Sequence, residues 1–457
     1  MKLSVIGLGK LGACTAACFA YKGIPTIGVD INADSVNAIN AGKAPVFEPR
    51  LQELIQAAGD RLEATLDFDR AIQDSEVTFI VVPTPSRDDG HFSNAFVEEA
   101  LADLASALKK VRKKYHLFVI TSTVSPGVIE GELIPLVASV SGKKVNKDFG
   151  FCYNPEFIAL GSVISDFLNP DLVLIGESDP KAGDLLSRIY EKVCDNKPQI
   201  SRMSIPSAEV TKISLNSFVT MKISFANTLA NICERIPGAN IDDITRALGA
   251  DKRISPFYLR GGLSFGGPCF PRDNKAFSAF AREAGVDAFL AQATDEVNEV
   301  QVDRVAEKIL QDLPNHKKPA VAILGLSYKP NTPVIEESPS IKIIEKLLQA
   351  KDLLVEVYDP VALENTRAHF GDRVRYSTSL EECVGSSPIC VVATPDKAFR
   401  NLRREWFRFQ PTTIFDCWRI LDRVALGNGI RYLPLGISVQ NSPGVFDRPV
   451  KLVGKSR

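Results

Sequence analysis

The first thirty residues carry the pattern that most restricts the folds open to this chain. A short alternating strand over residues 2–6 leads directly into the sequence GLGKLG at residues 7–12. A helical run over residues 13–21 follows, and a second strand over residues 26–29 ends at Asp30. Strand, GxGxxG, helix, strand and acid in this order predict a dinucleotide-binding βαβ unit and a doubly wound parallel sheet. The alternative reading of the glycines alone is a tight turn that binds no ligand.

The residues around the acid favour NAD over NADP. Asp30 lies 18 residues after Gly12, where a carboxylate binds both hydroxyls of an adenosine ribose and repels a 2′-phosphate. No Arg or Lys occurs among residues 31–40 to receive such a phosphate. We therefore expect NAD as the cofactor.

Two later strands of the same sheet end in polar loops. A strand expected over residues 77–82 precedes PTP at 83–85, and one over residues 117–121 precedes STV at 122–124. Ligands of open α/β sheets sit at the carboxyl ends of parallel strands, although each hydroxyl here can equally cap the following helix. The expected cofactor contacts are Gly7, Gly9, Leu11, Gly12, Asp30, Thr84, Pro85 and Thr123.

The candidate reactive groups lie in three separate stretches. Glu156, in YNPEF, follows an expected strand and is either a surface carboxylate or part of the same crevice. Lys212 and Asn216 are four residues apart, hence on one face of a helix, although such a lysine can simply be solvated. Cys269 stands in FGGPCFPRD, a loop stiffened by glycines and prolines, with Asp273 four residues downstream. This loop suits a nucleophilic thiol, whereas most cysteines are small buried hydrophobes.

A long helix and a second α/β unit complete the chain. Residues 207–235 contain no Gly or Pro and predict a helix about 43 Å long, whose broad apolar face can join domains and form a dimerisation surface. The Lys/Pro-rich residues 314–319 are the best linker candidate. The following strands, expected over residues 320–324, 354–358, 389–393 and 413–415 with a helix over 338–349, predict a second parallel sheet.

The second sheet does not require a second dinucleotide, because its first strand is not followed by GxGxxG. Lys329 at the end of that strand is either a ligand for substrate phosphates or a surface lysine.

Composition excludes several classes of protein. The length of 457 residues suggests about three domains. A net charge of −1 gives no reason to expect a nucleic-acid or membrane partner, and neither a bilayer-spanning run nor a signal peptide is evident. Nine cysteines without framework spacing favour a reducing cytoplasm, and four histidines without ligand spacing predict no metal site.

Several motifs together resemble those of the UDP-glucose/GDP-mannose dehydrogenase family. GLGKLG, STV, NPEF, AEVTKISLN, RISPFYL, FGGPCFPRD and GLSYKPNTPVIEESP occur in that family's order, over about residues 1–440. The resemblance implies an α/β fold of two Rossmann-like, doubly wound parallel-sheet domains joined by a long central helix in a helical dimerisation region. The implied domains are an NAD-binding domain at 1–203, a central helical domain with the cysteine loop at 204–313, and a nucleotide-sugar-binding domain at 314–457. A cytoplasmic homodimer that forms through the central helix is implied as well.

The resemblance also implies the reaction, a four-electron oxidation of a sugar C6 alcohol to the acid with two NAD. Cys269 forms a thiohemiacetal and then a thioester, and Lys212 with Asn216 stabilises the oxyanion. Asp273, through a water held with Thr123, is the general base, and Glu156 acts in hydrolysis or proton transfer. The implied substrate contacts are Phe157, Lys212, Asn216, Arg253, Tyr258, Gly266, Tyr328 and Lys329, and Arg253 reaches the neighbouring subunit's substrate.

Three positions depart from the family pattern, and two of them lie in the substrate half. Leu160 replaces a second acid, and Glu336 replaces an arginine. The family's Asp-Gly-Arg reads Asp416-Cys417-Trp418-Arg419, which moves the cationic group by one residue or removes it. We therefore expect UDP-glucose or a UDP-N-acetylhexosamine as the substrate without choosing between them. The alternatives are a single-hydride dehydrogenase of the 6-phosphogluconate or hydroxyacid type and a catalytically silent NAD- and nucleotide-sugar-binding protein.

Overall fold

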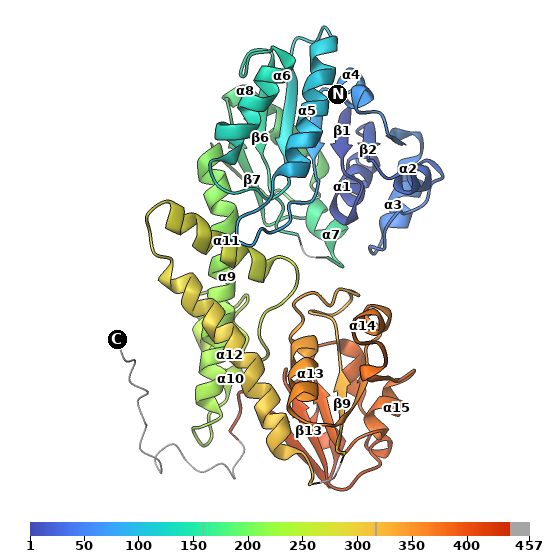
Figure 1. Cartoon of the computed structure of the whole chain (residues 1–457), viewed down its shortest axis with the longest axis vertical. Coiled ribbons are helices and arrows are strands. Elements are labelled where there is room, and N and C mark those ends of the chain that lie inside the picture. The colour runs from blue at the N-terminus through green and yellow to red at the C-terminus, as the bar shows by residue number, and fades with distance from the viewer. Residues whose placement is uncertain (159, 316–317, 439–457) are drawn as a thin grey trace. The chain divides into compact units, whose positions relative to one another are not determined.

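The computed structural model of the chain describes residues 1–158, 160–315 and 318–438, and it forms two compact units (Figure 1). The first unit comprises Met1–Leu215 and Ala279–Gly285, and the second comprises Asn216–Ser278 and the chain from Val286 onward. Residues 316 and 317 of the expected linker lie outside the described residues.

The first unit is built on an eight-stranded sheet in the order β3-β2-β1-β4-β5-β6-β7-β8. Its first six strands have the order typical of dinucleotide-binding sheets, as predicted. All its pairs are parallel except β6 with β7, so the last two strands run against the others. The strands are β1 (Leu3–Ile6), β2 (Thr26–Val29), β3 (Leu62–Thr65), β4 (Val77–Ile80), β5 (His116–Ile120), β6 (Phe149–Tyr153), β7 (Leu172–Glu177) and β8 (Gln199–Ser204).

Helices cover both faces of this sheet (Figure 1). The side chains of β1 alternate between the two cores, with Leu3 and Val5 in one and Ile6 in the other, as the period of two requires. The first core includes α1 (Lys10–Tyr21), α2 (Ala33–Asn40), α3 (Leu51–Ala58), α7 (Val163–Leu168) and α8 (Pro180–Val193). The second includes α4 (Phe68–Asp74), α5 (Ala95–Lys110) and α6 (Ile134–Ser141).

The second unit contains a six-stranded, wholly parallel sheet in the order β11-β10-β9-β12-β13-β14. One face packs on α12 (Phe289–Asp312), α13 (Pro339–Ala350) and α14 (Leu363–Phe370), and the other on α15 (Leu380–Gly385) and α16 (Arg423–Leu426). The strands are β9 (Ala320–Leu324), β10 (Leu354–Tyr358), β11 (Arg375–Tyr376), β12 (Ile389–Val392), β13 (Thr412–Asp416) and β14 (Ile430–Pro434).

The C-terminal half of α12 is part of this second core, through Val302, Val305 and Ile309. A helix expected in the central domain therefore packs on the C-terminal sheet, which is the physical reason why both fall in one compact unit. The boundaries of the expected three-domain division stay a prediction.

The predicted long helix is α9 (Ile205–Cys233), which has 29 residues and contributes to both units. It begins earlier than expected because Pro206 lies in its first turn, where the missing N–H would have no intrahelical partner. Two further helices follow it in the chain: α10 (Ile241–Ala250) in the second unit, and α11 (Phe270–Glu283), whose last residues from Ala279 belong to the first unit.

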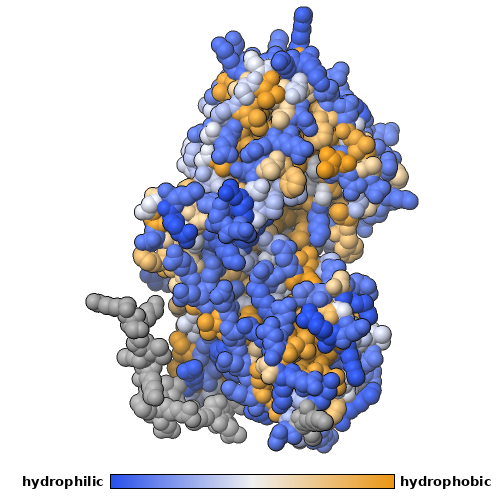
Figure 2. Space-filling view, in the orientation of Figure 1, coloured by the Kyte–Doolittle hydropathy of each residue, from blue (hydrophilic) through white to orange (hydrophobic). Residues whose placement is uncertain are grey.

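Among the described residues, none of the helices is both long and apolar enough to cross a membrane. In the face shown in Figure 2, hydrophilic residues predominate and hydrophobic ones form separate patches. The described part of the chain also contains no cluster of three His, Cys, Asp or Glu side chains placed to hold a metal ion.

Candidate active site

The three glycines of the first turn serve different purposes. A Cβ on Gly7, whose φ is +91°, would lie 2.6 Å from the Val81 carbonyl oxygen, and one on Gly12 would lie 1.8 Å from that of Gly7. A Cβ on Gly9 would meet nothing within 4 Å. Packing within the protein thus explains Gly7 and Gly12, while the open space at Gly9 fits the close approach of a pyrophosphate. Gly9 also precedes α1, whose N-terminus lacks a side-chain cap and is suited to an anion.

Asp30 is held in place by the backbone around this turn. Its Oδ2 accepts from the Leu8 N–H at 2.5 Å, and its Oδ1 accepts from the Asn32 N–H at 2.8 Å. The side chain is only partly buried, so each carboxylate oxygen keeps acceptor capacity for a ribose hydroxyl. These residues fit the adenosine half of NAD.

The second sheet has a similar glycine and strand-end aspartate, but the carboxylate of this aspartate is occupied by its own backbone. Gly325 has a φ of +92°, and Asp359 directly follows β10 as Asp30 directly follows β2. The Asp359 carboxylate accepts from the Leu326 and Ser327 N–H groups at 2.8 and 3.2 Å and from those of Val361 and Ala362 at 2.9 Å each. Because it is buried and saturated with backbone donors, Asp359 cannot hold a ribose as Asp30 can.

Leu11, another expected cofactor contact, lies on α1 and is partly buried against the first core. The other expected contacts lie in the loops that follow β4 and β5. Thr84 is buried after β4, and the Pro85 carbonyl accepts from the Ser93 N–H at 2.8 Å. Thr123 follows β5 and is partly buried; the preceding Ser122 hydroxyl donates to the Val82 carbonyl at 2.7 Å. This bond ties the β4 and β5 loops together.

The loop after β5 is also fixed by Glu209 of α9, which sequence reasoning missed. Its carboxylate accepts from the N–H groups of Gly127 and Ile129 at 2.7 and 3.1 Å. Burial raises the pKa of Glu209 to about 7, against the lowering by these two bonds. The sequence gives no signal for this role, because Glu209 lies in a helical stretch that mixes polar and apolar residues and contains a second charge at Lys212.

Lys212 is a buried, oriented cation rather than a solvated one. The residue is 6% exposed, its Nζ donates to the Glu156 carbonyl at 2.9 Å, and it lies 4.8 Å from the centroid of the Phe157 ring. The burial that Lys normally avoids is compensated here by a hydrogen bond and an aromatic face. Three predicted site residues therefore meet within the first unit.

The Glu156 carboxyl faces Tyr190 of α8. The Tyr190 hydroxyl lies 3.1 Å from Glu156 Oε1 and 2.5 Å from Asn154 Oδ1. Burial raises the pKa of Glu156 to about 7, against the opposing effects of the Tyr190 hydrogen bond and the Lys212 charge. A carboxyl that titrates near neutrality is suited to general acid–base work. Sequence reasoning missed Tyr190, because a tyrosine within an amphipathic helix gives no sign of its partner.

Cys269 is exposed and immediately precedes α11. Its carbonyl accepts the Asp273 N–H at 2.8 Å, which places Cys269 at the N-terminal end of the helix, where the peptide dipoles favour an anionic thiolate. A Cβ on Gly266 would lie 2.1 Å from the Glu337 carbonyl oxygen, and one on Gly267 would lie 2.5 Å from the Tyr328 ring. The two glycines thus let the cysteine loop pack directly on the loop that carries Tyr328.

Asp273 anchors this helix to α9. Its Oδ2 accepts from the Asn216 Nδ2 at 2.6 Å, and its other oxygen is 3.3 Å from Arg272 Nε. Both Asp273 and Asn216 are buried, at 1% and 7% exposure. The neighbouring Ser217 hydroxyl donates to Asn274 Oδ1 at 2.6 Å, which strengthens the same contact. Asn216 and Asp273 therefore lie on two helices joined by buried hydrogen bonds, and Cys269 directly precedes the second of them.

The other expected substrate contacts are more exposed. Arg253 has 88% of its side chain exposed and forms a bidentate ion pair with Asp251. Tyr258 has a φ of +59°, is 54% exposed, and packs edge-on against Phe270 with the ring centroids 6.1 Å apart. Lys329 is partly buried, with its Nζ 5.8 Å from the Tyr328 ring centroid.

Comparison with known proteins places this site in a family. Three sequence models of the UDP-glucose/GDP-mannose dehydrogenase family match the chain: the NAD binding domain over residues 1–194, the central domain over 206–300 and the UDP binding domain over 322–423. The chain belongs to the UDP-glucose/GDP-mannose dehydrogenase family. It is an NAD-dependent nucleotide-sugar 6-dehydrogenase that produces a uronic acid, so the predicted family, fold class, activity and cofactor are confirmed.

The relatives include members with different named substrates. The chain is 37% identical over 428 residues to the UDP-glucose 6-dehydrogenase AglM of Haloferax volcanii, covering 93% of this chain and 98% of the relative. It is 33% identical over 417 residues to the GDP-mannose 6-dehydrogenase of Pseudomonas putida, covering 88% and 93%. The UDP-glucose dehydrogenase structure from Pyrobaculum islandicum superposes with a TM-score of 0.86 at 31% identity, covering 96% and 98%.

Two departures from the family pattern have a local explanation. Leu160 is apolar and packs against the first core, so no second carboxyl stands at that position. Glu336 is exposed, and its carbonyl accepts the Gly267 N–H at 3.1 Å. Glu336 therefore supports the cysteine loop through its backbone, a contact that any side chain at this position allows.

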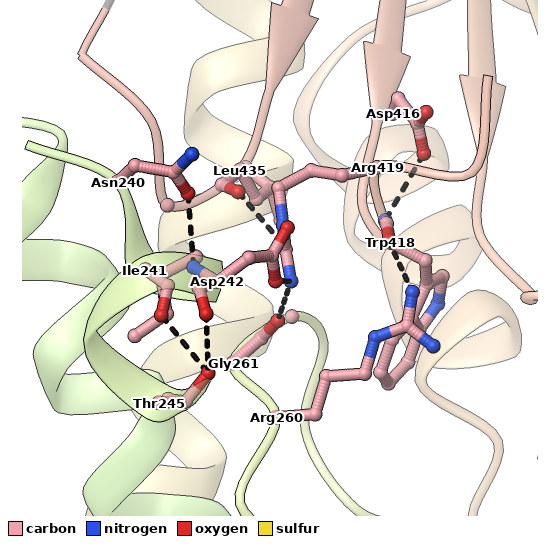
Figure 3. Close-up of polar contacts among 12 residues, drawn as sticks. Asn240, Ile241, Asp242, Thr245, Arg260, Gly261, Asp416, Trp418, Arg419 and Leu435 are labelled. Carbon is pink, nitrogen blue, oxygen red and sulfur yellow. Dashed lines mark hydrogen bonds and ion pairs between the residues drawn. The ribbon is translucent and has the colours of Figure 1, made fainter. Parts of the chain in front are cut away.

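The third departure changes which cation is available at the end of β13. Arg419, whose side chain is 4% exposed, forms a bidentate ion pair with Asp242 of α10 at 2.8 and 2.9 Å (Figure 3). It also donates to the Gly261 and Leu435 carbonyls. Figure 3 shows Arg260 instead beside Trp418, its guanidinium 5.6 Å from the indole and donating to the Trp418 carbonyl. Arg419 is thus fully engaged by its own chain.

Proposed function

We propose that this family member oxidises C6 of a UDP-linked hexose, either UDP-glucose or a UDP-N-acetylhexosamine, through a covalent Cys269 adduct. The observation that carries the proposal is the buried Asn216–Asp273 pair, which fixes the helix that begins directly after Cys269. Two relatives named as UDP-glucose dehydrogenases, from Haloferax volcanii and Pyrobaculum islandicum, support the choice of a UDP-sugar.

The thiol explains how one site removes two hydrides. Bound NAD supplies a hydride acceptor for each oxidation. The Cys269 thiol adds to the aldehyde formed first: a C–S bond forms, the carbonyl oxygen gains a proton, and C6 becomes tetrahedral again with a hydrogen to lose. The second oxidation gives a thioester. Water then adds to the thioester, the C–S bond breaks, the thiolate regains a proton and the sugar acid leaves.

The chain's other groups assist these steps. Lys212 and Asn216, one turn apart on α9, stabilise the oxyanions that develop on C6 oxygen. Asp273 removes the alcohol proton through a water held with Thr123, and Glu156 receives a proton in hydrolysis. The contacts assigned to the nucleotide sugar are Phe157, Arg253 toward the neighbouring subunit, Tyr258, Gly266, Tyr328 and Lys329.

A panel of UDP-, GDP- and TDP-sugars tests the proposal. Two NADH and one sugar acid per substrate consumed are expected, with the highest kcat/KM for a UDP-hexose. One NADH with a carbonyl product would instead support a single-hydride dehydrogenase, and binding without NADH would support a silent binding protein. Preference for a GDP-sugar would overturn the choice of nucleotide alone.

We also propose that the chain forms a homodimer through α9, in the cytoplasm. Phe218, Phe225 and Ile232 recur every seven residues on this helix and are 59%, 52% and 47% exposed. A stripe with this spacing lies along one face of a helix and is costly to leave in water.

The described residues include all nine cysteines and show no disulfide, which agrees with a reducing compartment.

A further inference from the structure

Tyr190 belongs to a buried polar chain that ends at the Glu156 carboxyl. The Asn154 Nδ2 donates to the Leu174 carbonyl of β7 at 2.9 Å, so its Oδ1 faces the Tyr190 hydroxyl 2.5 Å away. Tyr190 and Asn154 are 3% and 2% exposed, and the Tyr190 ring packs against Phe167 with the centroids 6.0 Å apart. These hydrogen-bonded side chains therefore have little freedom to rearrange except by moving protons.

A phenol carries one proton, and here it has two acceptors. When Glu156 is ionised, the Tyr190 hydroxyl can donate to its Oε1, 3.1 Å away. When Glu156 is protonated, the acid can donate to the phenol oxygen, and the phenol proton then turns to Asn154. Both protonation states of Glu156 are thus hydrogen-bonded without any heavy atom moving.

We propose that Tyr190 is a positioning residue for the reaction: it holds the Glu156 carboxyl and, by turning its single proton between Glu156 and Asn154, serves both protonation states of that acid. The role assigned to Glu156 in hydrolysis rests on the proposed function. The contact itself does not, because it is made wholly within the first unit.

The other groups that face Glu156 cannot replace this donor. Lys212 of α9 carries the nearby positive charge, but its Nζ donates to the Glu156 backbone carbonyl. Cys18 of α1 and Cys194, which follows α8, interact with the Glu156 carboxyl electrostatically, and burial raises the pKa of both thiols, that of Cys194 to about 11. Both thiols are therefore neutral at physiological pH, and a neutral S–H is a weaker donor than a phenol. Position 160, where the family has a second acid, is a leucine.

The expected effect has a defined sign. A hydrogen bond to the ionised form lowers the pKa of a carboxyl, so Tyr190→Phe raises that of Glu156. Since Glu156 must be ionised to receive a proton, the acidic limb of kcat against pH, at saturating NAD and nucleotide sugar, moves to higher pH by roughly 0.5 to 1 unit. Tyr115→Phe is the matched control, because the buried Tyr115 hydroxyl has no hydrogen-bond partner within the described structure.

Two further measurements separate positioning from folding. In a Glu156→Gln background, Tyr190→Phe must leave the profile unshifted, because the titrating group is gone. The infrared C=O band of the protonated Glu156 carboxyl, identified by its loss in Glu156→Gln, must titrate at higher pH in Tyr190→Phe. The infrared result stands even if no nucleotide sugar is turned over, which distinguishes failure of this inference from failure of the proposed function. An unshifted band, or an equal loss of kcat at every pH that persists in the Gln background, would overturn the proposal.

Discussion

At the scale of single residues, the environment decides which of several similar groups can do chemistry. The nine cysteines differ in this way: Cys269 is exposed at a helix N-terminus, whereas Cys14, Cys18, Cys152, Cys233, Cys383, Cys390 and Cys417 are buried and Cys194 is partly buried. Burial raises the pKa of the thiols in Cys14, Cys152 and Cys417 and keeps them neutral.

Cys269→Ser should abolish net formation of the sugar acid, with a loss of at least about a thousandfold in kcat. Serine is a weaker nucleophile than a thiolate and a poorer leaving group, so an ester can accumulate in place of the thioester. Mass spectrometry of the intact protein after a single turnover would detect that ester, and Cys194→Ser is the control. A Cys269→Ser enzyme with normal turnover would rule out the covalent route.

The two strand-end acids make a second comparison possible. Asp30→Asn keeps an oxygen for the Leu8 N–H but loses the charge that favours ribose hydroxyls, so the KM for NAD should rise about tenfold while kcat at saturating NAD changes less. Asp359→Asn should lower the thermal midpoint and leave the KM for NAD unchanged, because that carboxylate serves only its own backbone. Equal effects of both substitutions on the KM for NAD would contradict this distinction.

At the scale of elements, the contribution of an ion pair on α10 to the free energy of unfolding depends on how deeply the pair is buried. Arg419→Met leaves Asp242 without its partner and removes two backbone contacts, which should destabilise the protein by about 2 kcal/mol. We set this below the cost for a fully buried pair because Asp242 keeps 38% of its side chain exposed. Arg246→Met, which breaks the exposed Arg246–Asp243 pair on the same helix, should cost less than about 0.5 kcal/mol. Urea unfolding measures both free energies, and similar values would refute the difference in strength between the two ion pairs.

At the scale of the whole molecule, assembly is the property to test. Phe225→Glu places a charge in the exposed stripe of α9 and should shift the protein toward monomer in light scattering coupled to gel filtration. Val424→Glu, at a residue of α16 that is 87% exposed, is the control and should leave the mass unchanged. A Phe225→Glu protein that keeps a dimeric mass would place the interface elsewhere.

Features with a local cause were predictable from the sequence. The first βαβ unit, the length of α9, and strands β9 and β10 follow from glycine positions and apolar periods, and the structure bears them out. The sequence predicts a start of α9 at residue 207, after Pro206, whereas the helix begins at Ile205, because the first turn of a helix tolerates a proline. The stiff cysteine loop was also visible, since its glycines and prolines are adjacent in the chain.

The sequence by itself thus determined the fold class, the NAD-binding unit and the candidate thiol, because these depend on neighbours within about thirty residues. The tertiary structure decided the rest. It showed that the Asp359 carboxylate is occupied by backbone donors whereas the Asp30 carboxylate keeps acceptor capacity. It also showed that Lys212 is buried and that Tyr190 lies beside Glu156. The physical reason is that these properties depend on partners far apart in the chain: Arg419 is engaged by Asp242, 177 residues away, and no local pattern specifies which distant charge a buried side chain will meet.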